Sequence, residues 1–248
     1  MTHVVAGYPS FDECVELMLG MQEAGVNAIE VQIPFSDPSA DGPVIMDAND
    51  TALKNGMTID HSFKLIKEAR GNGLTIPIYV MSYVNKLYSY GFDLFCRESA
   101  KGTVSGLIIP DLTPGSNEYL ELKRLCIKED VDLVPVLSPA TQKTVIKSYG
   151  ISPDSFVYLT SSKGITGTSL TVRDELLKTV QLLRKTKCTV ALGFGIKSPQ
   201  DVRSALEIVD TAVIGSEIVR RINKEGVART IKYVQMLVNS EKEIDNEN

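Results

Sequence analysis

Val26-Asn-Ala-Ile-Glu-Val-Gln-Ile-Pro-Phe35 is a mainly apolar run that contains one acidic residue, Glu30, and Ser36-Asp-Pro-Ser-Ala-Asp-Gly-Pro43 follows it at once. A strand points alternate side chains to opposite faces, so Glu30 and Gln32 share one face. A carboxylate taken out of water needs a charged partner, hydrogen-bond donors or a proton. Because functional sites use such placements, Glu30 is the leading candidate for a catalytic residue.

Similar short apolar runs recur along the chain, with amphipathic stretches between them. This alternation is typical of βαβ units and a parallel sheet. Strands are predicted at residues 3–7, 27–33, 76–82, 105–110, 132–137, 155–160, 189–193 and 211–215. Helices are predicted at 11–24, 59–70, 117–128, 172–185 and 199–206, with starts at Ser10, Asp60, Ser116 and Ser198 and ends at Gly25, Gly71 and Gly73.

The number of predicted strands is that of a closed barrel. The chain is therefore predicted to be a single-domain α/β protein, a (β/α)8 TIM barrel over residues 1–238. Residues 239–248 are polar and charged, and we expect them to form a frayed tail.

The side chains that face the barrel axis can be predicted from the alternation within each strand. Apolar residues on the outer face pack on the helices, so the other face points inward. This assigns Glu30, Tyr79, Met81, Tyr83 and Tyr158 to the axis. A carboxylate and several aromatic side chains are thus expected in one lumen.

Composition argues against several classes of partner. The chain of 248 residues has a formal net charge of -5, which gives no basic surface for nucleic acid or an anionic membrane. No apolar stretch approaches the roughly 20 residues that cross a bilayer. We expect a cytoplasmic protein.

Cysteine and histidine are sparse. The four cysteines lack the spacing of metal ligands and are predicted to be buried thiols in a reducing cytosol. Only His3 and His61 are present, and neither lies in a motif. Both are interpreted as scaffold or surface residues, and no metal site is predicted.

Glycine-rich segments end the last two predicted strands. They read Gly193-Phe-Gly-Ile-Lys-Ser198 and Val213-Ile-Gly-Ser-Glu-Ile218. TIM barrels often bind phosphate after these strands, through backbone N–H groups and a helix N-terminus. Gly195, Gly215 and Ser216 are therefore candidate phosphate ligands, although simple tight turns explain the glycines equally well.

A second small-residue segment, Ser161-Ser-Lys-Gly-Ile-Thr-Gly-Thr-Ser169, follows the sixth predicted strand. Loops of this kind act as lids about as often as they act as passive connections. Gly164 and Gly167 are candidate hinges, and Thr166 is a candidate contact to substrate or to a catalytic carboxylate.

Two carboxylates on one rim suit acid–base chemistry, and Glu30 and Asp41 are the candidate pair. Asp37 competes with Asp41, but a turn in which its side chain accepts backbone donors is the favoured interpretation. Asp111 ends another predicted strand and is open to catalytic, structural or interfacial roles.

Taken in order, these motifs resemble those of the tryptophan synthase alpha subunit family. They read Ile29-Glu-Val-Gln-Ile-Pro-Phe-Ser-Asp-Pro-Ser-Ala-Asp-Gly-Pro43, Met81-Ser-Tyr-Val-Asn85, Pro110-Asp-Leu-Thr113, Gly164-Ile-Thr-Gly167, Gly193-Phe-Gly-Ile196 and Gly215-Ser216. The long first element is the most specific, and the match covers almost the whole chain.

The resemblance implies a carbon–carbon lyase that cleaves indole-3-glycerol phosphate to indole and glyceraldehyde 3-phosphate, without a cofactor in this subunit. It implies that Glu30 is the acid–base residue and that Asp41 accepts the indole N–H bond. The implied substrate contacts are Tyr83, Tyr158, Thr166 and Phe194, and the implied phosphate contacts are Gly167, Gly195, Gly215 and Ser216.

The resemblance also implies docking on a beta subunit that uses the indole to make L-tryptophan, in an αββα heterotetramer. The loops with Asp37 and Asp111 would form much of the contact, and the isolated subunit would be a weak enzyme. The chain departs from the family pattern at Gln32, Thr113 and residues 114–116. Gln32 shares the inward face with Glu30, within reach of a hydrogen bond to it.

Two other functions fit parts of the sequence. Another phosphate-binding barrel, an isomerase or synthase of a sugar or indole phosphate, would share the glycine segments. The second alternative is a non-catalytic barrel that only activates a beta subunit. The presence of both Glu30 and Asp41 argues against this hypothesis.

Overall fold

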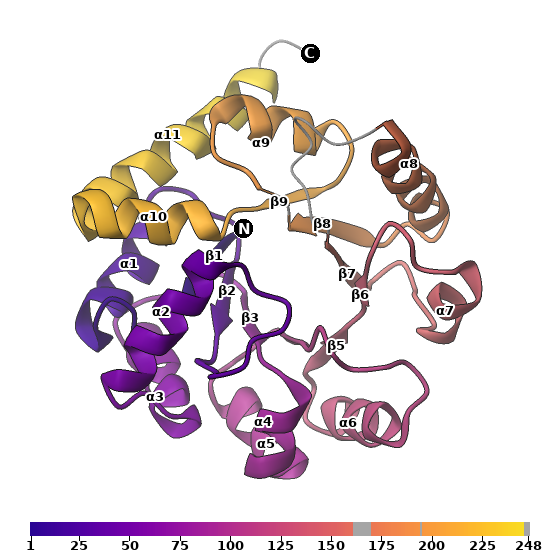
Figure 1. The fold of residues 1–248 in the computed structure, drawn as a ribbon, viewed down its shortest axis with the longest axis horizontal. Coiled ribbons are helices and arrows are strands. Elements are labelled where there is room, and N and C mark those ends of the chain that lie inside the picture. The colour runs from indigo at the N-terminus through magenta and orange to yellow at the C-terminus, as the bar shows by residue number, and fades with distance from the viewer. Residues whose placement is uncertain (161–169, 194, 246–248) are drawn as a thin grey trace.

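The computed structural model describes residues 1–160, 170–193 and 195–245, and shows a ring of parallel strands surrounded by helices (Figure 1). The strands are β1 (Thr2–Val5), β2 (Ile29–Gln32), β3 (Ile78–Met81), β4 (Gly106–Ile108), β5 (Asp132–Val134), β6 (Val136–Leu137), β7 (Phe156–Thr160), β8 (Thr189–Gly193) and β9 (Thr211–Val213). The helices are α1 (Phe11–Glu23), α2 (Pro43–Lys54), α3 (Ile59–Gly71), α4 (Val84–Tyr90), α5 (Phe92–Lys101), α6 (Asn117–Lys128), α7 (Lys143–Ser148), α8 (Leu170–Arg184), α9 (Pro199–Leu206), α10 (Ser216–Glu225) and α11 (Val227–Asp245).

The strands close into a barrel through two junctions. One sheet has the order β1-β2-β3-β4-β5 and the other β6-β7-β8-β9, and every pair in both is parallel. Thr2 bridges Ile214 after β9, and the Tyr158 N–H donates to the Pro135 carbonyl at 2.9 Å. The predicted (β/α)8 barrel is therefore confirmed.

The prediction of one continuous strand at 132–137 was wrong. Proline lacks an N–H group and interrupts a ladder of strand hydrogen bonds. Pro135 lies between β5, which pairs with β4, and β6, which pairs with β7. The fifth strand position is thus divided where the two sheets meet.

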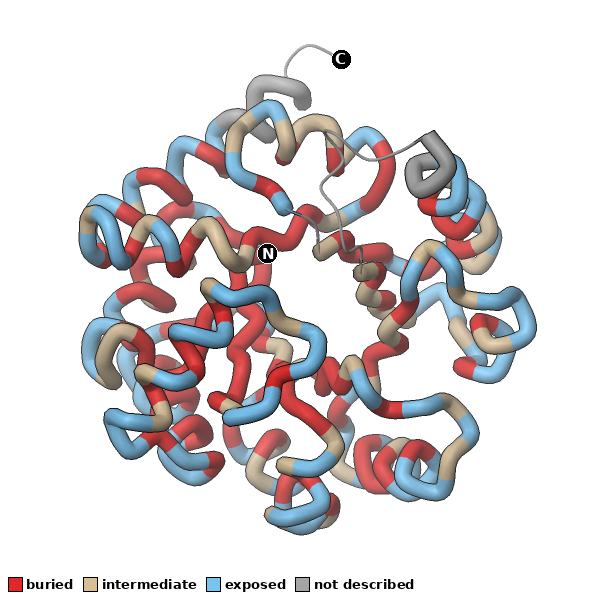
Figure 2. The backbone as a smooth tube through the Cα atoms, in the orientation of Figure 1, coloured by how far each residue is buried: buried red, intermediate tan, exposed pale blue. Residues whose placement is uncertain are grey.

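Buried apolar side chains form the core between the strands and the helices. Figure 2 shows buried residues along the ring of strands and on parts of the surrounding helices. Ile29, Val31 and Ile78 face outward and are fully buried there. The inward layer includes Met81, Tyr83 and Tyr158, as the strand alternation predicts. The rings of Tyr79 and Phe156 stack across the lumen, with centroids 4.4 Å apart.

Most predicted helix starts are confirmed. Ser10, Ser116 and Ser198 each accept a backbone N–H as N-caps. The prediction for Asp60 was wrong, because Thr58 caps α3 by accepting from the His61 N–H. Asp60 instead lies in the first turn, where a negative charge interacts favourably with the helix dipole.

The last helix extends into the segment expected to be a tail. Helix α11 continues to Asp245, so residues 239–245 are helical, and the barrel boundary at residue 238 stays a prediction. Glutamate and lysine are good helix formers, which favours this continuation. Among the helices that the structure describes, none is both long and apolar enough to cross a membrane.

Candidate active site

A cavity of about 380 Å³ opens where the strands end at their carboxyl side. Its wall combines His3 from β1, Glu30 from β2, Tyr158 from β7 and Gly193 from β8. Asp41 and Gly42, on the loop between β2 and α2, border the same space. This volume falls in the range of small-molecule sites, and the location is where TIM barrels hold their active sites.

Glu30 lies inside the barrel, as the alternation of β2 predicts. The residue is 2% exposed, and its Oε2 accepts a hydrogen bond from the Tyr158 hydroxyl at 3.2 Å. Burial, and then the charge of Glu30, raise the pKa of Tyr158 well above its ordinary value. The phenol therefore stays protonated and serves as a donor to the carboxylate.

His3 is the second partner of Glu30. Of the two predicted roles, scaffold or surface, the structure excludes the surface and places this histidine in the cavity wall. Its Nδ1 lies 3.4 Å from Oε1 of Glu30. Burial disfavours the charged imidazole, but the charge and hydrogen bond of Glu30, helped by Asp41 and Gln32, outweigh it and raise the pKa of His3. Glu30 thus lies between a phenol and a histidine that tends to hold a proton.

Asp41 enters the cavity from the loop after β2. Its Oδ2 accepts a hydrogen bond from Nε2 of Gln32 at 2.5 Å. Burial raises the pKa of Asp41, while Gln32, His3 and Tyr83 act in the opposite direction. Gln32 therefore binds Asp41, and the structure shows no hydrogen bond from it to Glu30.

Tyr83 supports this loop from behind. The residue is 1% exposed, and its hydroxyl accepts the Ala40 N–H at 3.2 Å. Burial, and then the charge of Asp41, raise the pKa of the Tyr83 hydroxyl, so it remains a neutral phenol. The described cavity wall does not include Tyr83, which acts on it through the Asp41 loop.

The other two aspartates lie on exposed loops at the same end of the barrel. Asp37 accepts the Ser36 hydroxyl at 2.6 Å, and the structure brings Asp41, not Asp37, into the cavity. Asp111 accepts the Val84 N–H at 3.0 and 3.2 Å and so tethers the start of α4. Its observed contact is structural, at a position that also faces solvent.

Glycines and a helix N-terminus form another part of the cavity wall. Gly215 and Ser216 begin α10 and line the cavity together with Gly195, whose φ of 27° is in the region that favours glycine. A Cβ at Gly193 would lie 2.6 Å from the Tyr158 hydroxyl, so this position also requires glycine. The predicted contacts Thr166, Gly167 and Phe194 lie outside the described residues.

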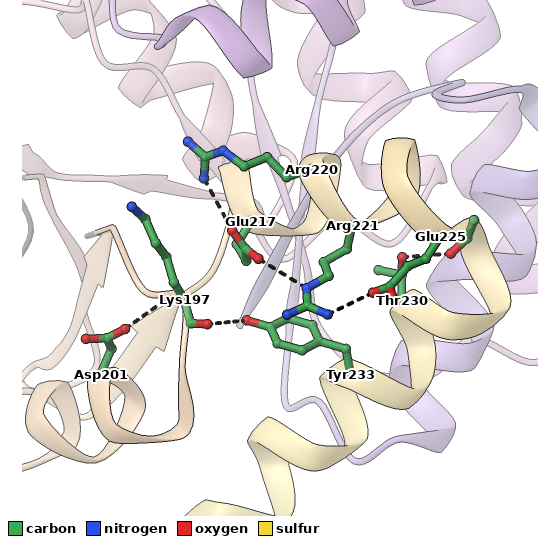
Figure 3. A network of polar contacts seen from close by, with 9 residues as sticks. Lys197, Asp201, Glu217, Arg220, Arg221, Glu225, Thr230 and Tyr233 are labelled. Carbon is green, nitrogen blue, oxygen red and sulfur yellow. Dashed lines mark hydrogen bonds and ion pairs between the residues drawn. The ribbon is translucent and has the colours of Figure 1, made fainter.

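Two cations of the cavity wall were missing from the sequence prediction. Lys197 and Arg220 both line the cavity. The Lys197 backbone donates to Asp201 and accepts from the Tyr233 hydroxyl at 2.9 Å, while Arg220 pairs with Glu217 at 3.4 Å (Figure 3). The Gly-Phe-Gly-Ile-Lys motif contained the signal for Lys197, since it places a lysine beside a predicted anion site.

The described residues hold no cluster of three or more His, Cys, Asp or Glu side chains that suits a metal ion. The polar groups of the cavity are instead a pair of carboxylates and, in the same wall, backbone N–H groups with two cations. This arrangement suits proton transfer on a ligand with an anionic tail.

The family profile described as "Tryptophan synthase alpha chain" matches residues 1–247. The chain belongs to the tryptophan synthase alpha chain family. Alpha chains are carbon–carbon lyases of tryptophan biosynthesis that cleave indole-3-glycerol phosphate to indole and glyceraldehyde 3-phosphate. The family implies a beta-subunit partner and a phosphorylated indole substrate.

Individual alpha chains agree with this assignment. The tryptophan synthase alpha chain of Desulforapulum autotrophicum is 34% identical, over 96% of this chain and 93% of the relative. "Tryptophan synthase" of Saccharomyces cerevisiae is 36% identical over 98% of this chain, which spans only 35% of that longer protein.

Solved structures show the same barrel. A tryptophan synthase structure from Mycobacterium tuberculosis has a TM-score of 0.83 at 26% identity, covering 96% of this chain and 90% of the other. The alpha subunit from Legionella pneumophila also has a TM-score of 0.83 at 26% identity, covering 99% and 92%.

Proposed function

We propose that this alpha chain cleaves indole-3-glycerol phosphate with Glu30 as the acid–base residue. The supporting observation is the position of Glu30, which is buried in the cavity wall and accepts from Tyr158 at 3.2 Å. A carboxyl group in such a place can give a proton to the substrate and take one back.

The proton movements balance the reaction. Protonation of indole C3 places positive charge on the ring system. When the neighbouring side-chain hydroxyl loses its proton, its oxygen forms the aldehyde C=O as the bond between C3 and the side chain breaks. The electron pair of that bond moves to the ring and restores the neutral indole. Glu30 serves the C3 and glycerol side in this scheme, and proton transfers alone complete it, so the subunit needs no cofactor.

Asp41 binds the indole N–H in this proposal. Its carboxylate would stabilise the positive charge that develops on the ring after C3 is protonated. Gln32 holds Oδ2 of Asp41 at 2.5 Å, which leaves the second oxygen for the substrate. Tyr158, Thr166 and Phe194 would contact the substrate, and Tyr83 would act through the Asp41 loop.

The phosphate group would lie at the part of the cavity wall formed by glycines and a helix N-terminus. Backbone N–H groups at a helix N-terminus bind anions well, and the start of α10 provides them at Gly215 and Ser216. Gly167 and Gly195 would complete the backbone contacts. Lys197 and Arg220 add positive charge to the same wall.

The proposed assembly is an αββα heterotetramer in the cytoplasm. Asp37 and Asp111 are exposed on loops at the end of the barrel where the cavity opens, and a beta subunit docked there could receive indole directly. All four cysteines are free thiols, including Cys96 and Cys126 with Sγ atoms 3.8 Å apart, which suits a reducing compartment.

The direct test is to incubate the purified chain with indole-3-glycerol phosphate and to measure both products. Equal amounts of indole and glyceraldehyde 3-phosphate are expected. An isomerised phosphate without free indole would favour the rival phosphate-binding barrel. Absence of turnover, combined with activation of a beta subunit, would favour the non-catalytic regulator.

A further inference from the structure

His3 and Gln32 lie between the two carboxylates of the cavity. Strand β1 pairs with β2 so that His3 is opposite Glu30 and Val5 is opposite Gln32. His3 and Gln32 are therefore diagonal neighbours on the inward face, a spacing that long side chains can bridge. Each contacts one of the carboxylates, His3 through Nδ1 at 3.4 Å and Gln32 through Nε2 at 2.5 Å.

The orientation of the Gln32 amide is fixed by its neighbours. Asn49 donates its amide N–H to the Ile45 carbonyl at 2.8 Å, so its oxygen is the atom that faces Gln32. Gln32 thus has two acceptors, the Asp41 carboxylate and the Asn49 oxygen, around its nitrogen. The amide nitrogen of Gln32 must be the atom that faces both acceptors, because only an N–H group can donate to them. The atom at the Oε1 position is therefore the carbonyl oxygen.

Two buried polar atoms are left over in this cluster. In the described part of the chain, neither Nε2 of His3 nor Oε1 of Gln32 has a hydrogen-bond partner within bonding geometry. An unsatisfied buried group is costly. In neutral His3 with its proton on Nδ1 toward Glu30, Nε2 is a lone pair and cannot bond to a carbonyl oxygen.

Protonation removes this conflict. An imidazolium has an N–H on both nitrogens, so Nδ1 can donate to Glu30 while Nε2 can turn its proton toward Oε1 of Gln32. We infer that His3 is a positioning residue whose imidazolium joins Glu30 to the Gln32–Asp41 pair and holds the two carboxylates in one hydrogen-bonded chain. This inference rests on the proposed function, since it assigns the chain of contacts a part in that reaction.

The charges around His3 support its protonation. Glu30 and Asp41 face it from β2 and the following loop, and together with Gln32 they outweigh the effect of burial and raise the pKa of His3. Helix α10 packs beside β1, so that a Cβ at Gly215 would lie 3.5 Å from Cβ of His3, and it contributes Arg220, which is paired with Glu217. The loop after β8 contributes Lys197 to the same wall, and β7 contributes the Tyr158 phenol. Helix α2 contributes only apolar Ile45 to the wall.

The chain of contacts has a consequence for the reaction. Loss of the His3 proton would remove the positive partner of Glu30 and break the link to Gln32. Activity should therefore fall as the pH rises through the pKa of His3.

Histidine NMR tests the protonation without using activity. The chain has two histidines, and His61 is exposed on α3, so a His61→Gln variant assigns both imidazole signals. His3 is expected to titrate above the ordinary histidine value. Glu30→Gln and Gln32→Met should each shift the His3 titration downward. A His3 titration at or below the ordinary histidine value, or no response to either variant, would overturn the inference.

Kinetics test the role in catalysis. His3→Phe keeps a ring of similar volume without a donor, and His3→Gln keeps a donor that does not titrate. We expect His3→Phe to lower kcat by up to about a hundredfold, His3→Gln to retain more activity, and both to remove the fall of kcat at alkaline pH. Persistence of that fall in His3→Phe would contradict the inference. No cleavage by the unmodified chain at any pH would instead refute the proposed function, while the NMR titration would still report on the His3 contacts.

Discussion

Nε2 of Gln32 lies 2.5 Å from Oδ2 of Asp41, so the second inward side chain of β2 holds the carboxylate that enters the cavity from the following loop. One short strand thus places both acidic groups of the site. Glu30 belongs to β2 itself. Gln32, two residues after Glu30 on the same strand, holds Asp41.

Asp41→Asn should reduce catalysis and increase stability. The amide can still accept from Gln32, but it cannot stabilise positive charge on the indole, so indole release should slow by about a hundredfold. A normal rate in this variant would assign the indole contact to another group.

The stability effect follows from the raised pKa of Asp41. Between the pKa in the unfolded chain, near 3.8, and the higher value in the folded chain, the native state binds more protons. Stability is therefore lost as the pH rises through this window. Asp41→Asn should have the higher melting temperature at neutral pH, and the difference should vanish below the unfolded pKa. An unchanged or lower melting temperature at neutral pH would contradict this account.

Gly193→Ala should disturb Glu30 through Tyr158. The added Cβ would lie 2.6 Å from the Tyr158 hydroxyl and 2.9 Å from its Cε1, so the ring must shift away from Glu30. Such overpacking lowers the free energy of unfolding by about 1–3 kcal/mol. The displaced Tyr158 ring should also lower kcat, because its hydroxyl no longer donates to Glu30. Gly71→Ala is the matched control, because nothing lies within 4 Å of its Cβ. Full activity in Gly193→Ala would argue against a role for the Tyr158 contact.

Lys197→Ala should weaken binding of the phosphate group. Lys197 lines the cavity beside Gly195, and its charge should raise the affinity for an anion. We expect a higher KM and a weaker competition by inorganic phosphate, with a smaller change in kcat. Lys224→Ala removes the same charge from the exposed part of α10 and serves as the control. Equal effects of the two variants would indicate a general charge effect and no local phosphate contact.

A beta subunit should increase indole production by this chain, because docking is expected to complete the site. Asp37→Lys, at the rim of the barrel, should weaken that activation. Asp154→Lys changes an exposed charge just before β7, at the opposite end of the barrel, and should have no effect. The docking proposal fails if the beta subunit leaves the rate unchanged, and its location is wrong if the two variants behave alike.

The fold and one carboxylate were predictable because both depend on local patterns. Alternating faces placed Glu30 inside the barrel, and the spacing of apolar runs gave the strand positions. The break at Pro135 was missed because the residues around it form one apolar run that is typical of a single strand. The helical continuation to Asp245 was missed because a polar, charged segment at the end of a chain is typical of a tail.

The contacts of the site depend on long-range geometry, which the sequence pattern does not contain. His3 belongs to no motif, and only the register between β1 and β2 brings it opposite Glu30. Gln32 was within reach of Glu30 by alternation alone, but the path of the loop after β2 brings Asp41 closer. Lys197 and Arg220 likewise come to line one cavity only after the loop that follows β8 and helix α10 are placed in the fold.

The most direct test of the account is the rate of indole formation by Glu30→Gln. The substitution keeps the shape of the side chain and removes its ability to transfer a proton, so the rate should fall by about 10² to 10⁴. Circular dichroism and binding of a substrate analogue should remain as in the unmodified chain, and Glu16→Gln on the exposed face of α1 should be fully active. Near-normal indole release by Glu30→Gln would contradict the claim that Glu30 is the acid–base residue.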